Sequence, residues 1–470
     1  MNDLRKQKLI EGKDLYKYKE FMLESVAQEL MHSVQGNSHA GVSPRKRRRI
    51  EETEDEENYE NTNHFSKIQP KPCILNLPDV PDYDPVHFVR CHAKDNNPSD
   101  NRTKVWKCAF EPELDNPGET TNIVATCGGD ILCLLDCSTG KLMMRYKLPK
   151  EHFFTVAWTT VCSSTSSGRG SKRTNILATG GKLGIVHLIH PAQHLCYAEL
   201  KGHTKYISSL LVHPEEPTWL FSGGADAKVI LWDIGVPSFP DYKTSHKQLL
   251  VLQSPGGDVL NTVFLSNYLI AGCEKNCYGW HIDKSNLDKR MSRQPTLEIN
   301  IPKPQNDIVD ALVQVSNDII ATKCSQQGFI QLWRFSDVLA HAQNRKCVTA
   351  MPIARLKWKN VDTPYINLGA VLNAGLVYCG DDEGQLWIYN VKPVITKKIK
   401  KSTSYELMSP SRILPWPECC IPTEREQEKL MGDVLDKGEP IVINSATGSW
   451  NHEYIVAGTD NNLVCIWKKI

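Results

Sequence analysis

Long apolar runs are absent from this 470-residue sequence, in which no stretch approaches the roughly 20 consecutive apolar residues that a membrane-spanning helix needs. The N-terminal residues also lack the apolar core of a secretory signal peptide. A net charge of +1 at pH 7 means that no single sign of charge dominates the whole chain. From these absences we expect a soluble protein inside the cell, with no membrane partner.

Motifs for metal binding and catalysis are missing as well. The 16 cysteines are scattered singly through apolar runs such as Leu132-Cys133-Leu134, where a reduced thiol packs as a small apolar side chain. Neither the vicinal Cys419-Cys420 nor the loose group of His190, His194 and Cys196 has the ligand spacing of a zinc site. The sequence also has no nucleophile elbow, phosphate-binding glycine loop or HExxH helix. It therefore predicts no metal, no cofactor and no catalytic residues, so the chain is not expected to be an enzyme.

Residues 1–83 differ in composition from the rest and are predicted to form a disordered tail. Apolar residues recur at steps of three and four within residues 13–34, which favours a short helix that either docks on a partner or forms only transiently. Five consecutive basic residues predict a nuclear localisation signal: Arg45, Lys46, Arg47, Arg48 and Arg49. An acidic run follows at residues 51–60, so the alternative is a charged segment that only stays solvated.

Two serines are candidate phosphorylation sites. Ser43 and Ser409 each stand in a Ser-Pro-x-basic sequence, the form that cyclin-dependent kinases favour. A phosphate on Ser43 would add negative charge next to the basic cluster and partly neutralise it.

From Asp84 onward one pattern recurs, consisting of a small pair, a polar turn and a strand that ends in a bulky residue. The bulky residues of the seven copies are Leu135, Ile189, Trp232, Trp280, Trp333, Tyr389 and Trp467. Most copies are about 50 residues apart, which is typical of a four-stranded propeller blade. The sequence therefore predicts an all-β, seven-bladed WD-repeat β-propeller over residues 84–470, with an insertion at about residues 397–438. The segment at residues 86–91 is expected to close the ring as the outer strand of the last blade.

The third copy carries every part of the WD repeat, from Gly202-His203 to Trp232-Asp233. His203, Asp226 and Trp232 are expected to form a hydrogen-bonded set that fixes one blade. The apparent His/Asp pair is therefore predicted to be structural and not catalytic.

A candidate binding site comes from aligning the innermost strands of the seven repeats. The second position of that strand is occupied, around the ring, by Trp106, Phe154, Ser208, Asn261, Asp310, Tyr365 and approximately Val442. Small or polar residues usually occupy such a solvent-facing edge, so three aromatics on one arc are unusual. Trp106, Phe154 and Tyr365 predict a cage for a quaternary ammonium group such as that of trimethyl-lysine, because ring faces attract a dispersed positive charge. The alternative is that these rings pack against loops or a protein partner.

Residues 202–233, together with Phe153-Phe154-Thr155-Val156-Ala157-Trp158, resemble the Polycomb-group embryonic ectoderm development family. This resemblance implies an aromatic cage for repressive trimethyl-lysine marks at the mouth of the channel, with Trp106, Phe154 and Tyr365 on three cage positions. The fourth position, normally Trp, is occupied by Pro364.

The sequence resembles the leucine-rich repeat and WD repeat-containing family more closely, through Asp84-Pro85-Val86-His87-Phe88, Cys108-Ala109-Phe110-Glu111-Pro112 and Leu414-Pro415-Trp416-Pro417. The resemblance implies a nuclear adaptor on heterochromatin, in centromeric or telomeric regions. Its implied partners are subunits of the origin recognition complex and the histone H3 and H4 tails carrying trimethyl-lysine. One departure is large, because residues 1–83 contain no leucine-rich repeat. Either the chain is a truncated or variant form, or the functions of that domain are absent.

Two other functions stay open. Many WD-repeat proteins are substrate receptors of cullin ubiquitin ligases, although such receptors usually carry Arg two residues after the Trp-Asp pair, where this chain has Gly235. Basic loop residues favour direct nucleic-acid contact without base specificity. They are Lys397, Lys398, Lys400 and Lys401 in one loop and Arg169, Lys172 and Arg173 in another. Ordinary solvated loops account for the same residues.

Overall fold

The computed structural model describes residues 74–470 apart from residues 98, 165–170, 239–241, 243–244, 288–292, 305–306, 344, 360, 362, 373, 397–405 and 417–440. The predicted tail helix, the basic cluster at residues 45–49 and Ser43 lie outside the described residues. No described helix is both long and apolar enough to cross a lipid bilayer.

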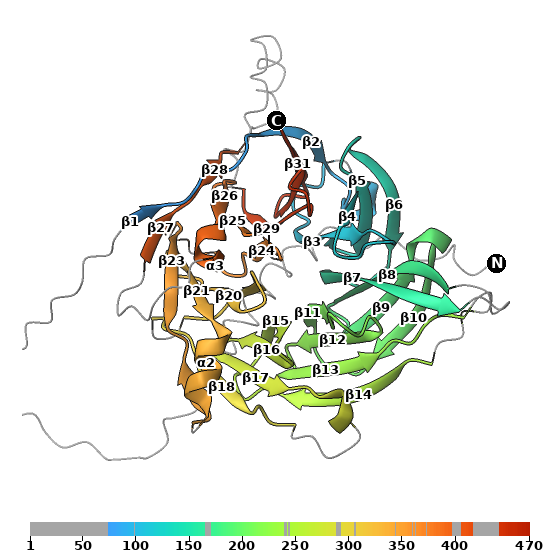
Figure 1. The fold of residues 1–470 in the computed structure, drawn as a ribbon. Helices are drawn as coiled ribbons and strands as arrows, with labels where there is room; N and C mark the ends of the chain where they lie inside the picture. The colour runs from blue at the N-terminus through green and yellow to red at the C-terminus, as the bar shows by residue number, and fades with distance from the viewer. Residues whose placement is uncertain are drawn as a thin grey trace, which may run out of the picture. The chain divides into compact units, whose positions relative to one another are not determined.

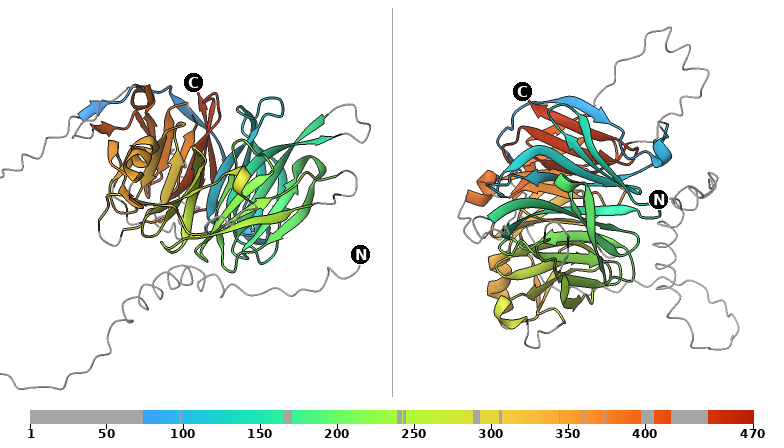
Figure 2. Two further views of the ribbon diagram at one scale, coloured as in Figure 1. Left: turned by 60° about the horizontal axis from the view of Figure 1, so that its bottom comes forward. Right: turned by 90° about the vertical axis from the view of Figure 1, so that its right-hand side faces the viewer.

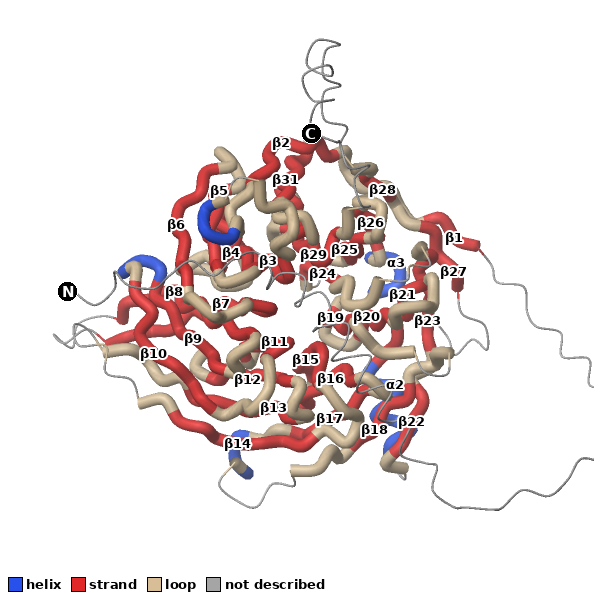
Figure 3. The backbone as a smooth tube through the Cα atoms, turned by 180° about the vertical axis from the view of Figure 1, so that it is seen from behind, coloured by secondary structure: helices blue, strands red, loops and turns tan. Residues whose placement is uncertain are grey.

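The described strands form seven sheets arranged as blades around a central channel (Figure 1). Seen from behind, the innermost strands of the blades surround the channel, and helices are few and short (Figure 3). The fold is therefore the predicted seven-bladed β-propeller.

Blades one to three each have four strands. Blade one consists of β3 (Val105–Pro112), β4 (Thr120–Gly128), β5 (Ile131–Asp136) and β6 (Lys141–Lys147). Blade two consists of β7 (Phe153–Ser164), β8 (Ser171–Gly181), β9 (Ile185–His190) and β10 (Leu195–Lys201). Blade three consists of β11 (Ile207–Val212), β12 (Trp219–Gly224), β13 (Lys228–Asp233) and β14 (Lys247–Gln253).

Blades four and five carry added strands at their outer edges. Blade four consists of β15 (Val259–Leu265), β16 (Tyr268–Cys273), β17 (Cys277–His281), β18 (Leu297–Asn300) and the added β22 (Cys347–Thr349). Blade five consists of β19 (Ala311–Gln314), β20 (Ile319–Lys323), β21 (Phe329–Arg334), β23 (Pro352–Lys357) and the added β27 (Glu406–Ser409) and β1 (Ile74–Asn76).

The last two blades have four strands each. Blade six consists of β24 (Leu368–Val371), β25 (Leu376–Gly380), β26 (Leu386–Asn390) and β28 (Arg412–Leu414). Blade seven consists of β29 (Ile443–Gly448), β30 (Tyr454–Thr459), β31 (Val464–Lys469) and β2 (Tyr83–Val89). The connections include the helices α2 (Phe335–Ala342) and α3 (Lys392–Thr396) and single 3-10 turns at Lys94–Asn96, Pro191–Gln193 and Lys284–Asn286.

The hydrophobic core lies between neighbouring blades, which pack face against face around the ring (Figure 2). Phe221 of β12 and Phe264 of β15, for example, stack across blades three and four with ring centroids 5.7 Å apart. The middle strands are apolar on both faces, because each blade is covered on both sides. This is why their sequences contain continuous apolar runs and not a strict alternation.

Hydrogen bonds between side chains fix blade three as predicted. The indole N–H of Trp232 donates to the hydroxyl of Ser222 at 2.8 Å. The same hydroxyl lies 2.8 Å from Nε2 of His203, whose Nδ1 is 2.8 Å from the carboxylate of Asp226. Since both ring nitrogens of His203 are used inside the blade, the predicted hydrogen-bonded set is confirmed.

The ring closes through β2, which pairs antiparallel with β31 from Tyr83 opposite Lys469 to Val89 opposite Val464. The expectation that residues 86–91 supply the outer strand of blade seven is thus confirmed for the part that lies in β2. Closure covers the edge of β31, which would otherwise present unpaired backbone groups.

The sheet structure extends beyond the predicted boundaries in two places. β1 precedes the expected start at Asp84, and it pairs parallel with β27. The expected insertion at residues 397–438 contains β27, which pairs with β23, and β28, which pairs with β26. β27 and β28 therefore complete blades five and six. Residues 397–405 and 417–438 of the expected insertion lie outside the described residues.

Candidate functional site

A β-bulge interrupts most of the channel-lining strands near one end of the channel, which we call the mouth. In blades one, two, three, four and seven the register with the next strand shifts by one residue. A bulge leaves the extra residue unpaired and redirects its side chain. The extra residues are Trp106, Phe154, Ser208, Leu260 and Asn444.

Three aromatic rings form a continuous row at the mouth, which we call the aromatic arc. Trp106 and Phe154 lie edge to face, with ring centroids 5.9 Å apart and planes at 86°. Tyr206, the residue before β11, extends the row with its centroid 5.7 Å from that of Phe154. All three side chains are half-buried, so each keeps some of its surface open to solvent. Blades one, two and three thus each contribute one ring.

Tyr365 is held at its position by a buried ion pair. It precedes β24, whose pairing begins at Leu368, and its backbone adopts a left-handed φ of 68° that is unusual for a bulky residue. The Tyr365 N–H donates to Oδ2 of Asp310 at 2.9 Å. Oδ2 of Asp310 in turn lies 2.6 Å from Nζ of Lys323, and both of these side chains are fully buried. Asp310 is therefore a positioning residue for Tyr365.

Two carboxylates lie beside the tyrosines of the mouth. The Tyr206 hydroxyl donates to Oδ2 of Asp258 at 3.1 Å. Burial, followed by the charges of Glu274 and Asp258, raises the pKa of Tyr365 to about 12. Burial and the charges of Asp258 and Tyr365 raise the pKa of Tyr206 in the same way. Tyr365 thus lies within electrostatic reach of Tyr206 and of both carboxylates, although no ring contact joins it to the aromatic arc among the described residues.

A cation of the chain itself already lies over one ring of the arc. The ammonium group of Lys104 is 5.4 Å from the centroid of Trp106. This distance is within the range of a cation–π interaction. The contact shows that the Trp106 face accommodates a positive charge, and it also means that a ligand cation competes with Lys104 for that face.

The channel contains a cavity of about 240 Å³ whose lining includes Lys107, Ser208, Asn261 and Gln314 but no acidic residue. Burial lowers the pKa of Lys107. The positive end of a ligand is therefore favoured at the rim, beside Asp258 and Glu274, and disfavoured near Lys107. The charge distribution would therefore favour a cation beside the aromatic arc over one deep in the channel.

The sequence alignment of the seven innermost strands predicted one equivalent position in each blade, and three of these seven positions need correction. The bulge residue of blade four is the buried Leu260 and not Asn261. The bulge residue of blade seven is Asn444 and not Val442. Tyr365 lies before its strand, at a place that corresponds to Tyr206 and not to Trp106. A bulge adds one residue without any mark in the local sequence, so the alignment could not locate it.

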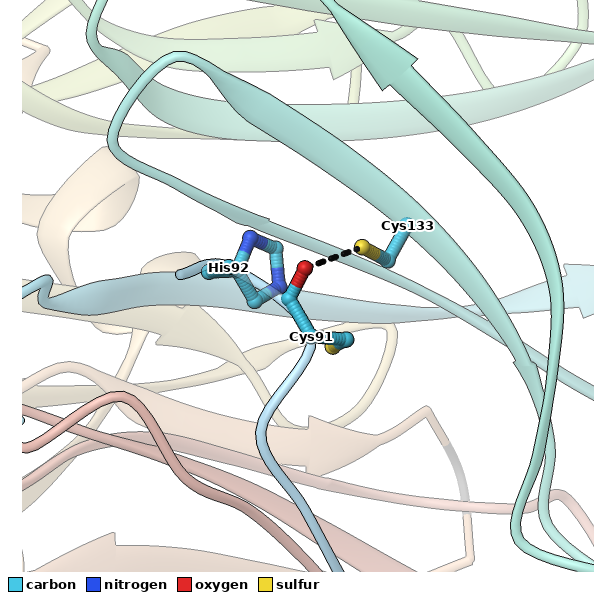
Figure 4. A group of neighbouring side chains, drawn as sticks. All are labelled: Cys91, His92 and Cys133. Atoms are coloured by element: carbon cyan, nitrogen blue, oxygen red, sulfur yellow. Dashed lines mark hydrogen bonds between the residues drawn. The ribbon is translucent and has the colours of Figure 1, made fainter. Parts of the chain in front are cut away.

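One buried group of Cys91, His92 and Cys133 has its ligand-type atoms within 4.8 Å of one another (Figure 4). The His92 Nε2 lies 2.9 Å from the hydroxyl of Thr126, and its Nδ1 lies 3.2 Å from the carbonyl oxygen of Ile131. The Cys133 thiol is directed at the carbonyl oxygen of Cys91, 3.4 Å away. Because both nitrogens of His92 are used within blade one, this group matches the framework role of His203 and does not fit a metal.

The other candidate residues are distributed as follows. Ser409 ends β27 opposite Asn76 of β1 and is half-buried. Lys172 and Arg173 are exposed on β8, and Arg173 donates to the carbonyl oxygens of Leu114 and Asp115. Lys397, Lys398, Lys400, Lys401 and Arg169 lie outside the described residues.

Comparison with known proteins gives matches that extend over most of the chain. The family model for the WD domain of leucine-rich repeat and WD repeat-containing protein 1 matches residues 80–470. The Xenopus laevis protein of that name is 37% identical over 426 residues, which cover 87% of this chain and 56% of the relative. The human protein is 34% identical over 391 residues, which cover 82% of this chain and 58% of the relative. The chain spans about half the length of these relatives.

More distant matches agree with the fold. The Polycomb protein esc of Musca domestica is 25% identical over 155 residues, or 32% of this chain. The crystal structure of the Chaetomium thermophilum polycomb repressive complex 2 contains a chain that superimposes with a TM-score of 0.55 at 12% identity, covering 82% of this chain and 98% of that one. At that identity the likeness concerns the propeller fold alone.

Proposed function

The chain belongs to the family of leucine-rich repeat and WD repeat-containing protein 1, and on this premise we propose that it is a chromatin-binding adaptor whose mouth binds trimethyl-lysine. The propeller is a WD-repeat scaffold, a fold that presents loops and a channel to partners. The proposed ligands are the trimethylated tails of histones H3 and H4.

The observation that supports this proposal is the aromatic arc with its adjacent carboxylates. A trimethylammonium group is a large cation that cannot donate a hydrogen bond, so ring faces and nearby negative charge are its main sources of attraction. Each face contributes on the order of 0.5 to 2 kcal/mol. Trp106, Phe154 and Tyr206 supply rings, while Asp258 and Glu274 supply the charge.

The arc also supports a substitute for the missing fourth aromatic. Pro364 stands where the resemblance placed a Trp, and it is exposed. Tyr206 brings a ring to the mouth from blade three, so the number of aromatics there is again four when Tyr365 is counted. We infer that Tyr206 takes part in the cage in place of the absent Trp.

The adaptor role needs a second partner, for which the origin recognition complex is proposed, in the nucleus. Weak binding of a histone tail by the mouth and binding of the complex elsewhere would reinforce each other by avidity. A pull-down of origin recognition complex subunits with the full chain tests this part. The Trp106→Ala variant is expected to recover the same subunits as the parent chain, because the two proposed sites are separate.

The test of the mouth is calorimetry with histone H3 peptides that carry unmodified or trimethylated lysine. Trp106→Ala should weaken binding of the trimethylated peptide by about two- to thirty-fold, the equivalent of one lost ring face. The matched control is Trp450→Ala, which removes an exposed indole from the turn after β29, at the end of that strand away from the mouth. Equal affinities for Trp106→Ala and the parent chain would eliminate the cage.

A further inference from the structure

A second pocket lies between blades six and seven, at the opposite end of the strands from the mouth. Strand β29 begins at Ile443, next to the mouth, and ends at Gly448, and the loop that follows carries His452 into this pocket. The pocket has a volume of about 190 Å³. One water molecule needs roughly 10–15 Å³ of such space, so there is room for a group of several heavy atoms. We call it the blade six–seven pocket.

Positive charge predominates in the blade six–seven pocket. Its lining includes Lys392, the first residue of α3, and Lys469, the last residue of β31. Both are exposed, and neither ammonium group forms an ion pair with any residue that the structure describes. Asp79 is the one carboxylate among the lining residues, and Val80 and Leu376 contribute an apolar wall.

His452 adds a buried polar atom that has no partner. Its Nδ1 is buried without a hydrogen bond in the described part of the chain. Such atoms are rare in folded proteins and call for an explanation. The backbone of His452 is fixed, because its N–H donates to the carbonyl oxygen of Ser449 at 2.9 Å and its own carbonyl accepts from the Tyr83 hydroxyl at 3.0 Å. The backbone of His452 is therefore anchored beside the pocket.

The two lysines also act on the ring electrostatically. Burial, followed by the charges of Lys392 and Lys469, lowers the pKa of His452. This shift favours the neutral ring, which has one N–H to donate. Two ammonium groups and one neutral donor around a small cavity suit an anion with more than one charge and several acceptor oxygens.

We propose that the blade six–seven pocket binds a phosphate monoester group, with Lys392 and Lys469 contacting its oxygens and His452 donating from its imidazole ring. A phosphate monoester carries about −1.5 to −2 charges and three strong acceptor oxygens at neutral pH, which matches the two lysines and the imidazole better than a singly charged carboxylate does. The group that carries the phosphate lies along Val80 and Leu376. This site is separate from the mouth, so its test does not depend on methyl-lysine binding.

The experiment is calorimetry on the full chain at constant ionic strength, with inorganic phosphate, a phosphoserine peptide and the same peptide without phosphate. Saturable binding of phosphate and of the phosphoserine peptide is expected, with no binding of the unmodified peptide. Lys392→Gln and Lys469→Gln should each weaken binding about tenfold. Lys141→Gln is the matched control, because it removes the same charge from an exposed lysine on β6. Equal weakening by Lys141→Gln, or no saturable binding, would overturn the proposal.

A spectroscopic measurement places the anion. In a spectrum of the ¹⁵N-labelled histidines, the His452 signal should move on addition of phosphate and of the phosphoserine peptide. It is identified by its loss in His452→Asn, a change that keeps a residue tolerant of the left-handed φ of 58°. Tighter binding of the phosphoserine peptide identifies a phosphorylated protein as the source, and equal binding identifies a free anion. An unchanged His452 signal at saturating phosphate would refute the assignment.

Discussion

At the scale of single residues, a side chain at the mouth is held in position by buried groups in the core. Asp310 and Lys323 form a fully buried ion pair, and Asp310 also accepts from the Tyr365 N–H. The ammonium group of Lys323 lies 4.9 Å from the ring centroid of Trp358, whose own N–H donates to the Gly380 carbonyl oxygen. The position of Tyr365, a residue of the proposed cage, is therefore connected to the core of blades five and six.

Asp310→Asn should be strongly destabilising. It leaves the Lys323 ammonium buried without its counter-charge, which costs about 3–5 kcal/mol in comparable pairs. Urea unfolding of the full chain measures the loss. Asp382→Asn is the control, because Asp382 forms a partly exposed pair with Lys359 that is expected to contribute less than about 1 kcal/mol. Similar losses for both variants would contradict the large contribution expected of the buried Asp310–Lys323 pair.

Lys104→Gln should strengthen binding of a trimethylated histone peptide. The substitution removes the cation that lies over Trp106, and an exposed contact of this kind is worth about 0.5–1 kcal/mol, or roughly two- to five-fold in affinity. Calorimetry against the parent chain gives the ratio, and Lys141→Gln corrects for the change in net charge. Weaker binding by Lys104→Gln than by Lys141→Gln would show that Lys104 helps the ligand and does not compete with it.

At the scale of the element, each blade is fixed by its own hydrogen bonds, and blade three shows how these depend on pH. Burial alone would raise the pKa of Asp226, but the hydrogen bond and charge of His203 and the N–H of Thr204 hold it below its usual value. A carboxyl with a lowered pKa in the folded state stabilises the fold above its unfolded pKa, about 3.9. That contribution disappears as the pH falls through the lower, folded value.

The free energy of unfolding should therefore fall as the pH drops from about 5 toward 2, and Asp226→Asn should make this fall shallower. Urea unfolding over that range measures the slope. Asp95→Asn serves as the control, because the Asp95 carboxylate is 77% exposed and belongs to no blade framework. An unchanged slope in Asp226→Asn would show that its pairing with His203 carries no stability.

The blades were predictable from the sequence because each repeats the same turn and the same bulky strand end. His203, Asp226 and Trp232 lie together as predicted, since Asp226 and Trp232 belong to the β12–β13 hairpin and His203 lies in the loop before β11 of the same blade. The bulges that aim Trp106 and Phe154 were not predictable, because the extra residue leaves no sign in the sequence. Tyr206 was missed for a related reason. It lies directly before β11, whereas the alignment of blade three began inside that strand.

Long-range strand pairing was the other part that the sequence did not predict. β27 lies in what looked like an insertion, yet it pairs parallel with both β1 and β23. Its few residues have no alternation to mark them as a strand. Only the assembled ring supplies the edge on which these short strands form.

At the scale of the whole molecule, ring closure by β2 should govern stability. A chain that begins at residue 92 lacks β2 and exposes the edge of β31, whereas a chain that begins at residue 74 keeps every described strand. The shorter chain should unfold at lower urea concentration and self-associate, because an open edge pairs with other chains. Urea unfolding and sedimentation compare the two. Equal stability and equal mass would mean that closure contributes little.

The two proposed sites are chemically opposite and lie at opposite ends of the strands. The mouth combines aromatic rings with Asp258 and Glu274, and the blade six–seven pocket combines Lys392, Lys469 and His452. A partner that is both methylated and phosphorylated would have to span the thickness of the propeller to reach both. Two separate partners are the simpler arrangement, in keeping with an adaptor.

The most direct measurement is a crystal structure of the chain with a histone H3 peptide that carries trimethyl-lysine. The account predicts that the trimethylammonium group contacts Trp106, Phe154 and Tyr206, within about 6 Å of their ring centroids. It also predicts that the ammonium group of Lys104 is displaced from the Trp106 ring. A peptide bound at another surface, with Lys104 still over the indole, would contradict it.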